Sequence, residues 1–249
     1  MRIAVCLKRV PDTTTKIVIG PDGKSIDESG VKFVPNPYDE YALEEALKLK
    51  EAAAAGETAV YCLGGDAAQE TIRTALAMGI DRGVLLQAAP SADGLEVARA
   101  LAGELKSGSF DLILFGKLAV DDYNHQVGVM VAELLGIPCV TSVAHLTIAG
   151  EALEAEREIE GGVEVVTAQL PAVLTCDKGL NTPRLPSLKG IMAAKKKPLQ
   201  VKQASLGAGT VSALGLVLPP ERKAGQIVGE GADAVPELVR LLREEAKVI

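Results

Sequence analysis

Residues 116–128 combine the residue types that could bind a nucleotide. They follow a short apolar run and lead into a helical pattern that begins at Gln126. Backbone N–H groups at a helix N-terminus bind anions, and the side chains of Asn124 and Gln126 add neutral donors. Asp121 and Asp122 could accept hydrogen bonds from a ribose or from an adenine amino group. The alternative is a polar strand-to-helix loop in which an Asp or Asn caps the helix.

The segment Asn36-Pro37-Tyr38-Asp39-Glu40 is the second candidate. Pro37 biases Asn36 toward extended backbone, and Asp39 suits a helix cap or an acid in the first turn. These features predict a helix start. If that start faces the edge of a sheet, the same residues would touch a ligand there.

Other chemistry has little support. Gly64-Gly65-Asp66 is superficially similar to the Gly-Gly-x-Asp loop of ATP pyrophosphatases, but the serine that precedes that loop is missing. Asp66 and Gln69 instead match a helix capping box. A P-loop and a G-x-G-x-x-G motif are both absent. With only two histidines and four isolated cysteines, the sequence predicts neither nucleophilic catalysis nor a metal site.

Composition excludes several classes of protein. Of the 249 residues 48% are apolar and 24% charged, which rules out disorder as the main state. The net charge of −7 and the aromatic content of 3% disfavour binding to DNA or RNA. No apolar run is long enough for a membrane span, and no targeting segment precedes the first apolar run. We therefore expect a cytoplasmic protein that does not insert into membranes.

Strand and helix patterns alternate in the first half of the chain. Leu43, Ala46 and Leu47 share an apolar helix face, while Glu40, Glu44, Lys48 and Glu51 form the other. This alternation predicts an α/β fold with a mostly parallel sheet and helices on both faces, in which ligands bind at the carboxyl ends of the strands. We expect strands at residues 2–10, 58–63, 83–87 and 112–115, and helices at 39–54, 67–78, 92–105 and 126–135.

The pattern changes after Pro138. Three alternating segments separated by glycines predict a β-meander at residues 139–148, 152–159 and 163–169, and a further strand is expected at 171–175. Residues 177–206 show no periodicity, and an amphipathic helix is predicted at 233–247. We thus expect a nucleotide-binding domain with a meander (1–176), an extended recognition arm (177–210), and a C-terminal strand and helix (211–249).

Basic residues gather in the predicted arm. Lys195-Lys196-Lys197, with Arg184 and Lys189, makes one basic patch on an acidic protein. Such a patch suits an acidic protein partner. The alternative is a solvated surface strip.

Many short segments, in this order and spacing, identify a family. They are Val5-Cys6-Leu7-Lys8-Arg9-Val10-Pro11-Asp12, residues 36–46, residues 70–79, residues 116–128, Arg157-Glu158-Ile159-Glu160-Gly161-Gly162, Leu170-Pro171-Ala172-Val173, Asn181-Thr182-Pro183-Arg184, Ile191-Met192 and Lys195-Lys196-Lys197. On these the chain resembles the small (beta) subunit of electron-transfer flavoproteins over nearly its whole length.

The resemblance implies a fold, cofactors and partners. It implies an adenine-nucleotide-binding, universal-stress-like domain that holds AMP in a structural role and makes no bond itself. A larger alpha subunit would hold most of the FAD. The heterodimer would take electrons from acyl-CoA or other flavin dehydrogenases, as in fatty acid beta-oxidation, and deliver them to a quinone reductase.

The resemblance also implies a set of binding residues. Cys6 and Leu63 would flank adenine, and Asn124 and Gln126 would hold the phosphate. The AMP pocket implied is Cys6, Asn36, Pro37, Tyr38, Asp39, Leu63, Gly116, Lys117, Leu118, Ala119, Val120, Asp121, Asp122, Tyr123, Asn124, His125, Gln126 and Val127.

Two positions bear on the choice between AMP and a second FAD. Electron-bifurcating relatives hold FAD at this site and typically have Asp-Gly-Asp-Thr in the loop. The sequence Asp121-Asp122-Tyr123-Asn124 has a bulky residue and no glycine, which favours AMP. Thr13 stands where some relatives have a tyrosine near the flavin, so no stacking on the flavin by this subunit is expected.

The arm would dock the dehydrogenase. In the family a leucine of the arm enters a pocket on the dehydrogenase, and Leu188 is the matching position. The docking residues expected are Arg184, Leu188, Lys189, Ile191 and Met192. The alternatives are a stand-alone nucleotide-binding protein of the universal-stress type, which has little use for such an arm, and a nucleotide-cleaving enzyme.

Overall fold

The computed structural model describes residues 1–53, 55–89, 93–207, 209–221 and 224–249. The chain divides into two compact units, residues 1–215 and 216–249.

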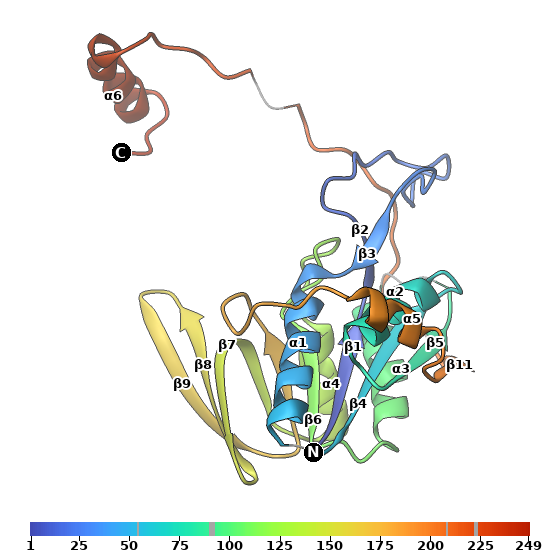
Figure 1. Ribbon diagram of the computed structural model, residues 1–249. Helices are drawn as coiled ribbons and strands as arrows, with labels where there is room; N and C mark the ends of the chain where they lie inside the picture. The colour runs from blue at the N-terminus through green and yellow to red at the C-terminus, as the bar shows by residue number, and fades with distance from the viewer. Residues whose placement is uncertain (54, 90–92, 208, 222–223) are drawn as a thin grey trace. The chain divides into compact units, whose positions relative to one another are not determined.

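A nine-stranded sheet forms the centre of the first unit (Figure 1). Its spatial order is β11-β5-β4-β1-β6-β10-β7-β8-β9. Neighbours from β11 to β7 are parallel, and β7, β8 and β9 are antiparallel. The predicted parallel sheet and β-meander are therefore confirmed. The strands are β1 (Arg2–Leu7), β4 (Glu57–Gly64), β5 (Arg82–Gln87), β6 (Leu112–Gly116), β7 (Cys139–Ala149), β8 (Ala152–Ile159), β9 (Gly162–Gln169), β10 (Ala172–Cys176) and β11 (Leu199–Gln203).

Helices cover both faces of the parallel part. Because side chains alternate along a strand, Ile3 and Val5 of β1 pack on one face and Ala4 and Cys6 on the other. The first face is covered by α1 and α2, and the second by α3 and α4. These helices are α1 (Pro37–Ala52), α2 (Ala68–Met78), α3 (Gly94–Leu105) and α4 (Val127–Leu135).

The topology creates one switch point. Strands β1 and β6 are parallel neighbours, but α1, which follows β1, and α4, which follows β6, lie on opposite faces. A crevice at the carboxyl ends of two such strands is the usual ligand site of an open α/β sheet. The fold therefore directs attention to the loops that follow Leu7 and Gly116.

The predicted strand 2–10 is wrong as a single element. Strand β1 ends at Leu7, and β2 (Arg9–Pro11) pairs with β3 (Phe33–Pro35) in a separate antiparallel ribbon. The backbone N–H of Lys8 donates to the side chain of Asp39 instead of to a neighbouring strand, and this ends the ladder. The guanidinium of Arg9 lies 3.4 Å from the centre of the Phe33 ring and supports the ribbon.

Two details of the helices differ from the sequence analysis. The capping box is wrong: α2 begins at Ala68 after Ala67, without a side-chain cap, and Asp66 accepts a hydrogen bond from Gln87 at 2.8 Å. Glu44, expected on the charged face of α1 away from the apolar residues, is only 5% exposed. The ends predicted at residues 54 and 92 lie outside the described residues.

The arm is more ordered than expected. Within residues 177–210 the chain forms α5 (Leu188–Ala194), which packs on α2, and then β11, which pairs with β5. The helix has seven residues, too few to show a period in the sequence. Strand β11 has only two alternating apolar residues, Leu199 and Val201, and so short an alternation is a weak strand signal.

The second unit has η1 (Ala232–Ala234) and α6 (Val235–Glu244). This confirms the C-terminal helix. The strand expected in residues 211–249 is wrong for the part that the structure describes, where η1 and α6 are the only regular elements. No helix in the described ranges is long and apolar enough to cross a bilayer.

Candidate functional site

Asn36 joins the start of α1 to the loop after β6. Its backbone is extended at the N-cap and Pro37 opens the helix, as predicted. Its side chain is 1% exposed. The amide donates to the carbonyl of Leu118 at 2.8 Å and accepts from the N–H of Val120 at 3.1 Å. Asn36 therefore fixes the path of the loop.

Asp39 is the buried centre of the same network. Its carboxylate accepts hydrogen bonds from the N–H of Lys8 at 2.8 Å, the N–H of Gly116 at 3.0 Å and the Asn36 amide at 3.0 Å. Burial raises the pKa of Asp39 to about 7, and these three donors oppose the rise. The network ties α1 to the carboxyl ends of both β1 and β6.

Gly116 has no room for a side chain. A Cβ at this position would lie 2.4 Å from Oδ1 of Asp39 and 2.7 Å from its backbone N. Only glycine allows β6 to approach the first turn of α1 this closely. The loop after Gly116 therefore starts from a fixed point.

Lys8 neutralises the acidic part of the loop. Its Nζ lies 2.8 Å from both Asp121 and Asp122. Burial lowers the pKa of Lys8, but the two aspartates outweigh burial and raise it. Asp122 also accepts from the N–H of Asn124 at 3.0 Å. Sequence reasoning missed Lys8, although a lysine directly after a buried strand and a pair of aspartates after the neighbouring strand were signals for this contact.

The tip of the loop is exposed and tightly turned. Tyr123 and His125 both have a φ of 55°, and Tyr123 is 62% exposed. Gln126 then precedes α4 and lies against the start of α3, since a Cβ on Gly94 would be 2.6 Å from its amide nitrogen. Helix α4 thus begins directly after the loop, so the free N–H groups of its first turn lie next to the loop's last residues.

Cys6 and Leu63 lie on the α3 and α4 face of the sheet. Cys6 is 4% exposed, and burial together with the charge of Asp39 raises the pKa of its thiol well above the usual range. It therefore stays a thiol at neutral pH and offers an apolar wall rather than a nucleophile.

Tyr38 and Lys117 are set apart from the rest of the predicted site. The Lys117 amine pairs with Asp177 at 2.8 Å and lies 5.1 Å from the centre of the Tyr38 ring. Both line a hollow of about 760 Å³ that Tyr41 and Asn181 also line. The structure thus brings Asn36, Asp39 and the loop together but places the side chains of Tyr38 and Lys117 at the hollow beside Asn181.

Ionic contacts hold the arm against α1. The Arg184 guanidinium binds Glu44 at 2.8 and 2.9 Å and Glu51 at 2.6 and 3.1 Å. The backbone N–H of Arg184 also donates to Glu44. The amide of Asn181 donates to the carbonyl of Tyr41 at 3.0 Å. These contacts explain the burial of Glu44.

A second set of contacts holds the arm against α2. Arg73 donates to the carbonyls of Ala194 and Lys197, and the Lys197 amine donates to the carbonyls of Leu76 and Ile80. The short helix α5 therefore lies between the α1 contacts of Arg184, which precede it, and these α2 contacts at its C-terminal end.

Comparison with known proteins decides the family. The electron transfer flavoprotein domain family matches residues 24–206. The chain is 44% identical to the electron transfer flavoprotein subunit beta of Bacillus subtilis (strain 168), with all of both chains aligned. It is 42% identical to that of Syntrophomonas wolfei over 100% of this chain and 98% of the relative. It is 41% identical to that of Homo sapiens over 98% of each chain. The chain belongs to the electron transfer flavoprotein beta subunit family.

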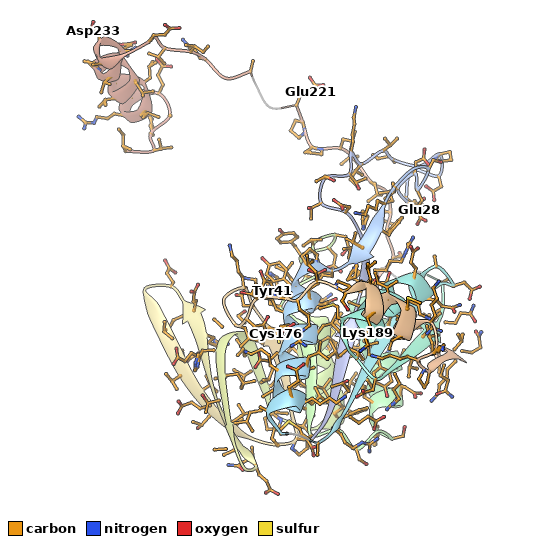
Figure 2. The ribbon with its side chains drawn as sticks, viewed as in Figure 1. Glu28, Tyr41, Cys176, Lys189, Glu221 and Asp233 are labelled. Atoms are coloured by element: carbon orange, nitrogen blue, oxygen red, sulfur yellow. The ribbon has the colours of Figure 1, made fainter. Side chains whose placement is uncertain are left out.

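The exposed side of α5 in this beta-subunit arm carries three apolar side chains. Leu188 is 83% exposed, Met192 71% and Ile191 45%. Figure 2 shows Lys189 on the same short helix. Arg184 points instead to α1, so the structure separates it from the other four expected docking residues.

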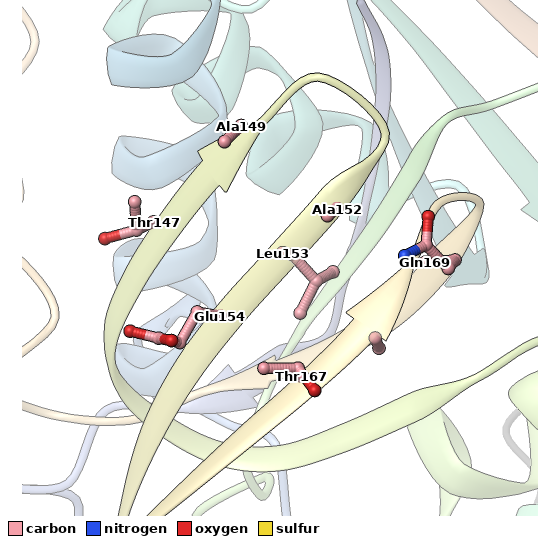
Figure 3. A pocket seen from close by; sticks show the side chains of 8 residues that line it. Thr147, Ala149, Ala152, Leu153, Glu154, Thr167 and Gln169 are labelled. Atoms are coloured by element: carbon pink, nitrogen blue, oxygen red, sulfur yellow. The ribbon is translucent and has the colours of Figure 1, made fainter.

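Two further observations on this electron transfer flavoprotein subunit concern metal binding and a second hollow. Among the described residues no group of three or more His, Cys, Asp or Glu could hold a metal ion. An open hollow of about 410 Å³ lies on the meander, lined by residues such as Ala149, Leu153 and Thr167 (Figure 3). None of its lining residues belongs to the predicted nucleotide site.

Proposed function

We propose that this chain holds AMP as a structural nucleotide and pairs with a larger alpha subunit that carries FAD. The network of Asn36, Asp39 and Gly116 carries this proposal. It fixes residues 116–120, the first part of the loop that leads to α4, at the switch point between β1 and β6. The loop leads to the N-terminus of α4, whose free N–H groups would bind a phosphate.

The residues around the network suit AMP. Cys6 and Leu63 offer apolar contact for adenine on the α3 and α4 face. Asn124, Gln126 and the first N–H groups of α4 would hold the phosphate. Lys8 neutralises Asp121 and Asp122, so the two carboxylates repel a nearby phosphate less. The loop has a bulky Tyr123 and no glycine at residues 121–124, which favours AMP over a second FAD.

The heterodimer would accept electrons from acyl-CoA or other flavin dehydrogenases and deliver them to a quinone reductase. This chain would supply the docking surface of α5 and would form no bond itself. The contacts of Arg184 and Lys197 support this role, because they hold α5 with its apolar side chains outward. A stand-alone nucleotide-binding protein would gain nothing from such a helix.

The nucleotide content of the assembled heterodimer tests the proposal. The chain is co-expressed with its alpha subunit and denatured, and the released nucleotides are counted. We expect one AMP and one FAD per heterodimer. Asn124→Ala should lower AMP content and melting temperature while the flavin spectrum stays unchanged, because the AMP stabilises the fold that binds it. Two FAD molecules per heterodimer, or no AMP, would contradict the proposal.

A further inference from the structure

The backbone of Lys8 is fixed at the end of β1 from both sides. Its N–H donates to the carboxylate of Asp39 at 2.8 Å, and its carbonyl accepts from the N–H of Asn36 at 2.9 Å. Both partners belong to the buried network at the start of α1. The Lys8 side chain therefore starts from a fixed point.

The side chain of Lys8 reaches the loop that follows β6. Its Nζ lies 2.8 Å from Oδ1 of Asp121 and 2.8 Å from Oδ2 of Asp122. One ammonium group thus holds two carboxylates that repel each other without it. The contact brings residues 121 and 122 to within the length of one lysine side chain from the end of β1.

The middle of this loop is held differently from its first part. Asn36 holds the first part through the carbonyl of Leu118 and the N–H of Val120. In the part of the chain that the structure describes, Lys8 supplies the only hydrogen bonds or ion pairs that reach residues 121–124 from outside the loop. The attachment of these residues to the sheet therefore depends on Lys8.

Hydrogen bonds within the loop close the turn at residues 121–124. The N–H groups of Asp122 and Tyr123 donate to the carbonyl of Ala119 at 3.3 and 2.9 Å, and the N–H of Asn124 donates to Asp122 at 3.0 Å. A turn held by these bonds alone opens more often than one that is also tied to a strand. The same three N–H groups therefore report whether Lys8 holds the turn.

We propose that Lys8 is a positioning residue that latches residues 121–124 to the end of β1, so that a nucleotide bound beside the loop leaves slowly. The inference rests on the proposed function, because it needs AMP between the loop, the start of α4 and the Cys6 side of the sheet. Releasing the latch frees the turn that leads to Asn124 and Gln126, the residues proposed to hold the phosphate. The side chain of Lys8 is 41% exposed, so salt weakens the latch.

Three variants separate the latch from the charge that Lys8 neutralises. Lys8→Met keeps an apolar stem and removes the ammonium group. Lys8→Arg keeps a cation that pairs with carboxylates. Lys8→Met combined with Asp121→Asn and Asp122→Asn has neither the latch nor the two charges that repel a phosphate. Lys48→Met is the control, because Lys48 pairs with Glu45 within α1 and is 47% exposed.

Amide hydrogen exchange of the full-length chain without nucleotide tests whether Lys8 holds the turn. We expect Lys8→Met to speed exchange at residues 122–124 about tenfold, the scale of two partly exposed ion pairs. Lys8→Arg and Lys48→Met should exchange at the wild-type rate. Unchanged exchange in Lys8→Met would overturn the latch.

Release of AMP from the assembled heterodimer tests the effect on the nucleotide. The heterodimer is loaded with radiolabelled AMP and diluted into unlabelled AMP at low and at high salt. We expect release about tenfold faster in Lys8→Met and in the triple variant, and wild-type release in Lys8→Arg and Lys48→Met. Release should rise more steeply with salt in the wild type than in Lys8→Met, because salt screens the ion pairs of the latch.

Two results of the release experiment would contradict the latch. Slow release from the triple variant would show that Lys8 acts only by neutralising the two aspartates. Equal salt dependence in the wild type and Lys8→Met would show that the ion pairs do not control release. A heterodimer that carries no AMP would instead contradict the proposed function, and the exchange experiment, which needs no nucleotide, would still decide whether Lys8 holds residues 121–124.

Discussion

Asp39 accepts a hydrogen bond from the backbone N–H of Gly116 at 3.0 Å. This contact joins the first turn of α1 to the end of β6. A second oxygen of the same carboxylate binds the N–H of Lys8 at the end of β1. The two strands at the switch point are thus held by one buried side chain, and the stability of the site depends on its charge.

Asp39→Asn should destabilise the fold and flatten its pH dependence. The pKa of a free aspartate is about 3.9, and burial raises that of Asp39 to about 7 in the folded chain. Between these values the folded chain binds more protons than the unfolded chain, so the free energy of unfolding falls as pH rises and levels off above about 7. The asparagine has no such titration. Its NH₂ group would also face an N–H donor, which costs roughly 1–3 kcal/mol.

Urea unfolding at several pH values between 5 and 8 measures both effects. The wild-type chain should lose more stability across this window than the asparagine variant. Equal slopes for the two proteins would show that Asp39 does not titrate there.

Gly116→Ala should damage the candidate nucleotide site. Its Cβ would lie 2.4 Å from the Asp39 carboxylate and 2.7 Å from backbone atoms of Asp39 and Tyr38, so the end of β6 must move away from α1. Overpacking of this kind costs about 1–3 kcal/mol. We expect a lower free energy of unfolding and a loss of bound AMP from the heterodimer.

Gly103→Ala is the matched control. Gly103 lies in α3 with nothing within 4 Å of its Cβ position, and alanine in a helix is favoured over glycine by up to about 1 kcal/mol. The control should be neutral or stabilising with full AMP content. Equal AMP content in the two variants would show that the close approach at Gly116 is not needed for AMP binding.

The sequence predicted the fold because its central strands are buried and alternate with helices. Several of the failures involve partners in other elements. Asp66 matched a cap locally, but Gln87 reaches it from a neighbouring strand. Glu44 belonged to the charged helix face by its spacing, but Arg184 pairs with it from 140 residues away. Short-range sequence patterns cannot predict such contacts between separate elements.

The candidate site shows the same limit. Asn36 and Asp39 read as a helix start, and the structure adds that they bind a loop about 80 residues later. Lys8 was missed because its two partners lie after another strand. Tyr38 stands between Asn36 and Asp39 in sequence, yet its ring lies near Lys117 at the hollow that Asn181 also lines.

Arg184→Lys should loosen the docking helix without unfolding the chain. The guanidinium binds Glu44 and Glu51 together, and a lysine amine cannot reproduce these paired contacts. Glu44 is buried, so losing its hydrogen-bond partners should weaken the contact between the arm and α1. We expect faster amide exchange of residues 184–194 and weaker binding of the dehydrogenase.

Glu51→Gln is the control for this substitution. The Glu51 side chain is 59% exposed, and exposed ion pairs contribute at most about 1 kcal/mol. Exchange of residues 184–194 should change little in this variant. If Arg184→Lys also left the exchange unchanged, the arm would be held by its α2 contacts alone.

Leu188→Ala should weaken the dehydrogenase complex and spare the subunit. Leu188 is 83% exposed at the start of α5, so its truncation removes little packing within the chain. Truncating an apolar anchor that enters a partner pocket costs about 2 kcal/mol or more of binding free energy, which is roughly a thirtyfold rise in the dissociation constant.

The control is Leu134→Ala. Leu134 lies on α4 and is 44% exposed, and its truncation should leave the affinity unchanged. Titration of the dehydrogenase with each heterodimer measures the affinity, and thermal unfolding measures the stability. If Leu188→Ala lowered stability and left the affinity unchanged, Leu188 would be a packing residue of its own subunit and not the anchor.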